Sequence, residues 1–338
     1  MPAGHAARKG RRAWLPGPSR CPTEVPSVLR RVLLAASASQ RVRNLITTAP
    51  VSRAVVRRFV AGETAEQALA VVERLLSDGL LVTLDYLGED TTEPEQAAAV
   101  AAEYVSLIGR LREAGHTAGG RTEVSVKPTA VGLGLAEHGE KTAAENIARI
   151  CAAASGAGTT VTVDMEDHTR VDATLRLVNW VRTDFPDLGC VLQSYLRRTP
   201  GDCEALAGAG SRVRLCKGAY SAPDGVALAI KSEVDRNYAR CLRVLLDGDG
   251  YPMFATHDPR LIAIASSRAA TVGREATSFE YQMLYGIRPD EQRRLAAGGA
   301  QVRVYVPYGS DWYGYLVRRL AERPANLGFF LRALRSRS

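Results

Sequence analysis

The 338-residue sequence has neither a long apolar run nor closely spaced cysteines. No stretch reaches the roughly 18 consecutive apolar residues that cross a membrane as a helix, and the first residues lack the apolar segment of a secretory signal. The six cysteines include no C-x-x-C pair, which argues against a zinc site and a disulfide framework. We therefore expect a soluble cytoplasmic protein with free thiols and no bound metal.

The sequence also lacks the complete motif G-x-G-x-x-G, which binds dinucleotides after the first strand of an open doubly wound sheet. Only fragments of it occur, at residues 132–134, 156–158 and 208–210. Hydrophobic residues nonetheless make up 46% of the chain, which is enough to bury one large core. The missing motif favours a closed barrel over an open sheet.

Positive charge is in excess, with 44 Lys and Arg against 36 Asp and Glu and a net charge of +8. Such a balance suits nucleic acid, an anionic membrane surface or an acidic substrate. Much of the excess lies near the two ends of the chain, at Arg8, Lys9, Arg11, Arg12, Arg20, Arg30, Arg31, Arg332, Arg335 and Arg337. The body of the chain has no cluster of basic and aromatic residues, so nucleic-acid binding is the weakest of these alternatives.

Three regions of the chain differ in residue pattern. Residues 1–27 are rich in Pro, Gly, Ala and Arg, so we predict that they are disordered or precede a natural start of translation near Val28. Residues 28–78 carry apolar side chains at helical spacing and are predicted to form N-terminal helices. Residues 79–332 alternate short β-branched runs with longer amphipathic stretches, the pattern of a separate catalytic domain.

Eight strand candidates lie in this last region, at Leu80–Leu87, Glu123–Pro128, Thr160–Glu166, Gly189–Leu196, Arg212–Gly218, Met253–Asp258, Ala276–Leu284 and Gln301–Tyr308. Helical segments between them include Glu95–Ala114, Thr142–Ala154, Arg170–Val181, Val226–Leu246 and Arg260–Ala269. This alternation indicates parallel strands with crossover helices. We predict an α/β fold, a (β/α)8 TIM-like barrel with an N-terminal helical extension and a C-terminal helix.

Polar residues stand at the predicted strand ends, where barrel enzymes carry their chemistry. They are Asp85, Lys127, Asp164, Glu166, Gln193, Lys217, His257, Glu280 and Tyr305. A single charged residue there is more often an ordinary rim group, so the convergence of all of them matters more than any one.

The segment after the last strand contains two adjacent arginines. Ser310 or Asp311 can begin a helix in which Tyr315, Arg318, Arg319 and Glu322 lie three and four residues apart. The arginine pair can form a fork for a carboxylate, held in place by Glu322. Taken alone, the segment is better described as a solvated helix with an ordinary ion pair, which is the commoner case.

Seven motifs together resemble the proline dehydrogenases and occur in the order typical of that family. They are Val124–Pro128, Asp164–Asp167, Gln193–Tyr195, Arg214–Tyr220, Phe254–His257, Phe279–Leu284 and Tyr315–Glu322. The resemblance extends over nearly everything past residue 28. It implies a flavoenzyme that binds FAD on a (β/α)8 barrel and oxidises L-proline to Δ1-pyrroline-5-carboxylate, with the C-terminal helix as a substrate clamp.

The resemblance also implies a set of roles. The residues expected to bind substrate are Lys127, Tyr220, Leu284, Tyr305, Tyr315, Arg318, Arg319 and Glu322. Those expected to bind FAD are Met165, Gln193, Arg214, Lys217, Gly218, Ala219, Thr256 and His257, with Arg214 also acting in catalysis beside Asp164. Asp164 is expected to pair with Lys127 or to support it. Ser194 and Cys216 depart from the family pattern beside these positions.

Partners follow from the same resemblance. Electrons are expected to pass to a membrane quinone, and the basic chain ends can hold the enzyme at the inner face of an anionic membrane. A separate pyrroline-5-carboxylate dehydrogenase would complete the pathway. The alternative enzyme is a Schiff-base aldolase or decarboxylase that uses Lys127 or Lys217, which requires a lysine of lowered pKa in a dry pocket.

Overall fold

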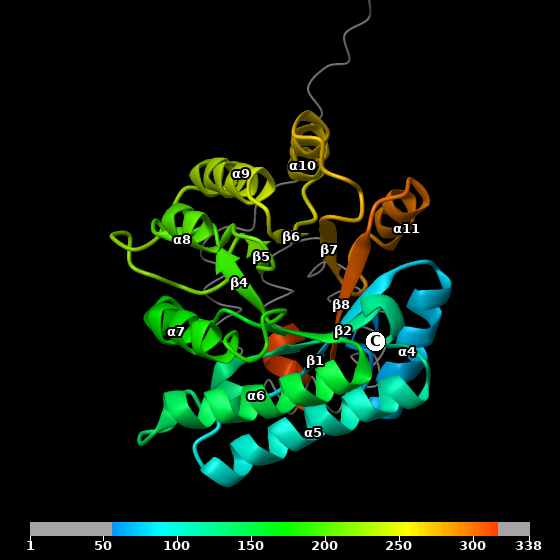
Figure 1. Cartoon of the computed structure of the whole chain (residues 1–338), viewed down its shortest axis with the longest axis vertical. Helices are drawn as coiled ribbons and strands as arrows, with labels where there is room; N and C mark the ends of the chain where they lie inside the picture. Colours follow the sequence, from blue (N-terminus) through cyan, green and yellow to red (C-terminus); the bar gives the residue numbers. More distant parts are fainter. Residues whose placement is uncertain (1–55, 317–338) are drawn as a thin grey trace, which may run out of the picture.

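The computed structural model describes residues 56–316, which form a closed parallel barrel surrounded by helices (Figure 1). Its strands are β1 (Leu81–Tyr86), β2 (Thr122–Val126), β3 (Thr160–Val163), β4 (Gly189–Gln193), β5 (Arg212–Cys216), β6 (Tyr251–Ala255), β7 (Glu280–Leu284) and β8 (Val302–Tyr308). Each strand pairs with the next, and β1 pairs with β8 from Leu81 opposite Arg303 to Tyr86 opposite Tyr308. The predicted barrel and all eight predicted strands are confirmed.

The helices are α4 (Ala65–Ser77), α5 (Pro94–Glu113), α6 (Gly139–Ala157), α7 (Val171–Val181), α8 (Thr199–Leu206), α9 (Lys231–Asp247), α10 (Pro259–Thr271) and α11 (Pro289–Ala297). Most of them follow the predicted segments, whereas α8 and α11 were not among those segments. The predicted start of α9 at Val226 is wrong. The Leu228 amide donates to the Tyr195 carbonyl at 2.7 Å, so this stretch joins the loop after β4 before the helix begins.

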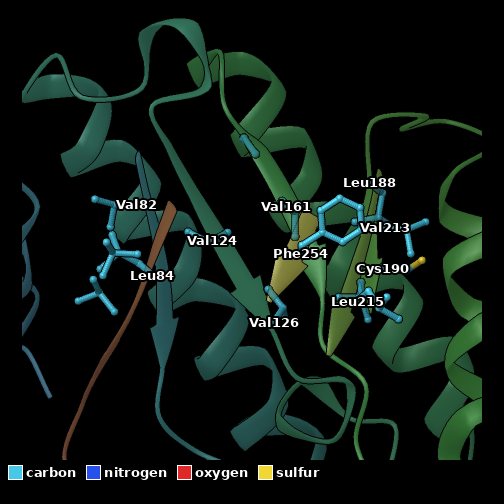
Figure 2. Close-up of a cluster of buried hydrophobic side chains, with 14 of the residues drawn as sticks. Val82, Leu84, Val124, Val126, Val161, Leu188, Cys190, Val213, Leu215 and Phe254 are labelled. Atoms are coloured by element: carbon cyan, nitrogen blue, oxygen red, sulfur yellow. The ribbon is translucent and has the colours of Figure 1, made fainter. Parts of the chain in front are cut away.

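The apolar core lies between the strands and the helices. Outward side chains alternate along each strand, and Figure 2 shows Val82, Leu84, Val124, Val126, Val161, Val213, Leu215 and Phe254 among them. Helix α9 presents Tyr238, Cys241, Leu242 and Leu245, which are buried at the three- and four-residue spacing of one helix face. Because this core uses every second strand residue, the other half of each strand is left to fill the barrel interior.

Several predictions fall outside the described residues. They concern residues 1–27, the part of the N-terminal helical region before residue 56, and the clamp residues Arg318, Arg319 and Glu322. Helix α4 lies within the predicted N-terminal helical region. In residues 56–316, no helix is both long enough and apolar enough to span a membrane.

Candidate active site

The barrel interior is polar, in contrast to the apolar layer outside the strands. Glu123 of β2 contacts Arg214 of β5 across the barrel at 3.0 Å, which is possible only if both side chains point inward. Buried inward residues include Thr83, Asp85, Ser125, Thr162, Gln193, Glu280, Gln282 and Arg303. Barrel interiors are usually filled by branched apolar residues, so an interior filled by charged and polar side chains is unusual for this fold.

Asp164, just after β3, is the centre of a hydrogen-bonded cluster at the carboxyl ends of the strands. Its Oδ1 accepts from Arg214 Nη1 at 2.8 Å and from Ser125 Oγ at 2.9 Å. Its Oδ2 accepts from the Tyr305 hydroxyl at 2.7 Å. The Arg214 guanidinium also lies over the Tyr305 ring, 5.3 Å from its centroid. Three predicted site residues, Asp164, Arg214 and Tyr305, therefore meet here.

Lys127 pairs with a different carboxylate from the one predicted. Its Nζ lies 2.6 and 2.7 Å from the two carboxylate oxygens of Asp85, and both side chains are buried. Of the two expected roles of Asp164, a direct pair with Lys127 is wrong, because the lysine reaches Asp85 instead. Burial acts to lower the pKa of Lys127, but Asp85 and Asp164 outweigh it and hold that pKa above its usual value.

Two buried polar atoms of the predicted cofactor site have no hydrogen-bond partner within residues 56–316. They are Arg214 Nε and Gln193 Oε1. The other end of the Gln193 amide is fixed, since Nε2 donates to the Met165 carbonyl at 3.1 Å. Buried polar groups are almost always paired in native proteins. One free donor and one free acceptor at this face are therefore available to a polar ligand, and the edge of a flavin ring carries both kinds of group.

The predicted residues for the rest of the cofactor follow β5 and β6. Lys217 Nζ lies 2.5 Å from Asp235 Oδ1 and 3.5 Å from Asp258 Oδ2. Gly218 has φ +103°, and an added Cβ would lie 2.1 Å from the Tyr195 ring. Only glycine fits there. Ala219 is exposed, and Thr256 Oγ1 accepts from the Asp258 amide at 3.1 Å.

An apolar wall closes one side of this region. Leu284 and Tyr315 belong to one cluster with Phe59, Val60, Leu87, Ile287, Trp312, Tyr313 and Leu316. The chain is helical from residue 312 to residue 316, in agreement with the predicted start of the clamp helix. The Leu284 amide donates to His257 Nε2 at 2.9 Å, which ties the wall to the end of β6. Tyr220 lies half-buried in the loop after β5.

Two polar residues of the site, Ser125 and Glu123, were given no role in the sequence analysis, and a third, Glu280, was placed at the wrong end of its strand. Ser125 and Glu123 support the site from below, and Glu280 stands at the amino end of β7 beside Arg303 instead of at the catalytic end. A signal was present in the sequence. Glu123-Val-Ser-Val-Lys127 alternates polar and apolar residues, whereas parallel strands buried on both faces are usually continuously apolar.

Glu166 is a further buried carboxyl group next to the site. Its oxygens accept from the Thr129 amide at 2.9 Å and from the Thr129 hydroxyl at 2.6 Å. Burial raises its pKa to about 7, although the hydrogen bonds from Thr129 favour the ionised form. This group therefore changes charge near neutral pH.

Enzymes with a (β/α)8 barrel carry their active sites at the carboxyl ends of the strands. The buried polar side chains at that face of this barrel are therefore typical of an enzyme. The family model described as proline dehydrogenase matches residues 68–332. The chain therefore belongs to the proline dehydrogenase family.

Curated relatives agree with this membership. The chain is 43% identical over 282 residues to the proline dehydrogenase of Deinococcus radiodurans, a match that covers 83% of this chain and 90% of the relative. It is 39% identical over 283 residues to proline dehydrogenase 1 of Bacillus subtilis, covering 84% and 91% of the two chains. These alignments extend over nearly the whole length of both relatives.

Solved structures of longer proteins share the fold. Proline utilization A of Bdellovibrio bacteriovorus, inactivated by N-propargylglycine, matches with a TM-score of 0.73 at 22% identity, covering 86% of this chain and 38% of the other. A Bradyrhizobium japonicum proline utilization A mutant matches with a TM-score of 0.67 at 25% identity, covering 83% and 32%. The chain thus spans about a third of the length of these proteins.

Proposed function

We propose that this chain oxidises L-proline to Δ1-pyrroline-5-carboxylate with FAD bound at the carboxyl ends of the barrel strands. Membership of the proline dehydrogenase family supports the activity. The observation that carries the cofactor proposal is the pair of unpartnered buried atoms, Arg214 Nε and Gln193 Oε1, in the part of the chain that the structure describes. Both belong to residues that the family resemblance assigns to the flavin.

The residues divide into two groups around the proposed reaction. When bound, FAD supplies the acceptor for the hydride that leaves C5 of proline, and loss of the amine proton completes the conversion. Met165, Gln193, Arg214, Lys217, Gly218, Ala219, Thr256 and His257 hold the cofactor. Asp164 fixes Arg214 through a 2.8 Å ion pair, so a cation stays where negative charge develops on reduction.

Substrate binding is assigned to cations and an apolar wall. Arg318, Arg319 and Lys127 bind the proline carboxylate, and Glu322 orients the two arginines. Tyr220, Leu284, Tyr305 and Tyr315 enclose the pyrrolidine ring and exclude water. The ordered cluster around Leu284 and Tyr315 supports a preformed wall.

The proposed setting is the cytoplasm, at the inner face of the cell membrane, with a quinone as electron acceptor. The basic chain ends support attraction to an anionic surface. The longer Escherichia coli relative is named bifunctional. For this chain we assign the next step to a separate pyrroline-5-carboxylate dehydrogenase, as the family resemblance implies. We retain residues 28–78 and 79–332 as the proposed helical and catalytic units.

The Schiff-base alternative is disfavoured by the surroundings of both lysines. Lys127 is paired with Asp85 and its pKa is raised, whereas an amine nucleophile needs a lowered pKa. Lys217 is held by Asp235 and Asp258. Neither lysine is a free amine in an apolar pocket.

The test uses the visible spectrum of the purified full-length protein without oxygen. L-proline should bleach an oxidised flavin band, hydroxyproline should bleach it more slowly, and Arg318→Met should abolish bleaching at low proline concentration. A protein that cannot be loaded with FAD, or whose flavin stays oxidised with proline, would refute the proposed function.

A further inference from the structure

Glu123 lies inside the barrel, below the residues assigned to the reaction, and contacts three arginines from two other strands. Its Oε1 accepts from Arg214 Nη2 at 3.0 Å, and its Oε2 accepts from Arg212 Nη2 at 2.9 Å. Arg303 Nε lies 3.9 Å from Oε1. The Thr83 hydroxyl donates to Oε1 at 2.6 Å. We propose that Glu123 is a positioning residue, which orients the Arg214 guanidinium toward the cofactor.

The carboxylate is ionised where it stands. Burial acts to raise the pKa of Glu123, but Arg303, Arg212 and Arg214 outweigh it and lower that pKa to about 2. A charged acceptor makes a shorter and stronger hydrogen bond to a guanidinium than a neutral one does. Glu123 is thus a charged acceptor for Arg214 at neutral pH.

The geometry of Arg214 shows what the anchor does. Asp164 and Ser125 hold Nη1 at 2.8 and 2.9 Å, and Glu123 holds Nη2 at 3.0 Å. A guanidinium is planar, so fixing both terminal nitrogens fixes the direction of the remaining Nε–H. That N–H is one of the buried donors that have no partner in residues 56–316. Without Glu123, only one end of the plane would be held.

Glu280 offers a matched comparison inside the same interior. Its carboxylate is also fully buried, and its partners in residues 56–316 are Arg303 Nε at 2.8 Å, the Tyr251 hydroxyl at 3.1 Å and the Gln282 amide at 2.5 Å. Removing either carboxylate leaves a buried arginine with a lost partner, so both changes lower stability. Only the change at Glu123 releases Arg214.

The inference rests on the proposed function, and the experiment separates the two. The midpoint potential of the flavin, the dissociation constant for FAD and the melting temperature are measured for the wild-type full chain, Glu123→Met, Glu123→Gln and Glu280→Gln. Glu123→Met should make the potential more negative and weaken FAD binding roughly tenfold, about 1.4 kcal/mol, because the Arg214 cation is then held at only one end. Glu123→Gln keeps an acceptor for Nη2 and should lie closer to the wild type.

Glu280→Gln should lower the melting temperature while leaving the potential and the FAD dissociation constant unchanged. In an Arg214→Met background, Glu123→Met should not shift the potential further. An unchanged or raised potential in Glu123→Met, or equal shifts in the Glu123 and Glu280 variants, would overturn the positioning role. If Glu123→Met does not fold, Glu123→Gln is compared with Glu280→Gln by the same criterion. A wild-type chain that binds no FAD would instead overturn the proposed function and, with it, this inference.

Discussion

Lys127 and Asp85 form a buried ion pair in which one ammonium group contacts both carboxylate oxygens, at 2.6 and 2.7 Å. The two residues lie on adjacent strands of the barrel: Asp85 is in β1, and Lys127 comes just after β2. The pair keeps the Lys127 ammonium charged in a site assigned to a substrate carboxylate. Its contribution to the free energy of unfolding can be measured.

Asp85→Asn should destabilise the protein by about 3–5 kcal/mol, because it leaves the Lys127 ammonium buried without its counter-ion. The measurement is the free energy of unfolding in urea. Asp290→Asn is the control, since the Asp290 side chain is almost fully exposed and its ion pair with Arg293 should matter by less than about 1 kcal/mol. Similar losses at the two positions would show that the buried pair is not special.

Glu166 should make stability fall as the pH rises. Its folded pKa of about 7 lies above the ordinary value of 4.5, so the folded state binds the proton more tightly than the unfolded state. The contribution is complete below about pH 4.5 and is lost as the pH rises through 7, by roughly 3 kcal/mol at about 1.4 kcal/mol per pKa unit.

Glu166→Gln should remove this dependence. The difference in unfolding free energy between pH 5 and pH 8 should shrink by roughly 2.5 kcal/mol relative to the wild type, because part of the contribution is already lost at pH 5. Glu145→Gln, at an exposed position of α6, should leave the difference as it is. The prediction fails if the two variants have parallel stability curves.

Tyr305→Phe should cost about 1.5–3 kcal/mol of stability, because its hydroxyl donates to the charged Asp164 at 2.7 Å. The comparison is Tyr285→Phe, whose hydroxyl accepts from Arg74 at an exposed position and should cost little. Thermal and urea unfolding of both variants provide the measurement. Equal effects would mean that the Asp164 contact contributes nothing beyond an ordinary surface hydrogen bond.

Gly218→Ala should destabilise the protein by about 1–3 kcal/mol and weaken FAD binding. The new methyl group would collide with the Tyr195 ring, and alanine would be strained at the φ of +103° that residue 218 adopts. Adding Tyr195→Ala should restore part of the FAD affinity by removing the ring. It should not restore all of it, because the backbone strain remains. The measurement is the FAD dissociation constant of the double variant. Partial recovery would show that the clash with Tyr195 contributes, and no recovery would show that the backbone strain alone weakens binding.

The sequence was sufficient to predict the barrel because the strands carry β-branched runs at regular intervals between amphipathic segments. It could not identify pairs that form only when the barrel closes. Arg214 and Glu123 are 91 positions apart in sequence and meet across the interior. The pairing of Lys127 with Asp85 was not predicted for a related reason. Strand β1 pairs with β2 with Asp85 opposite Ser125, and this register brings Asp85 to the lysine.

The polar barrel interior constrains how chains of this kind can diverge. Changing one member of the set Glu123, Arg212, Arg303 and Glu280 removes a charged partner from a shared ion-pair network, and the loss of Arg303 leaves the buried Glu280 without its ion pair. The apolar layer between strands and helices accepts volume-conserving exchanges such as Leu for Met at a modest cost. Substitutions inside the barrel must therefore occur as compensating sets, whereas residues of the apolar layer between strands and helices can be replaced one at a time.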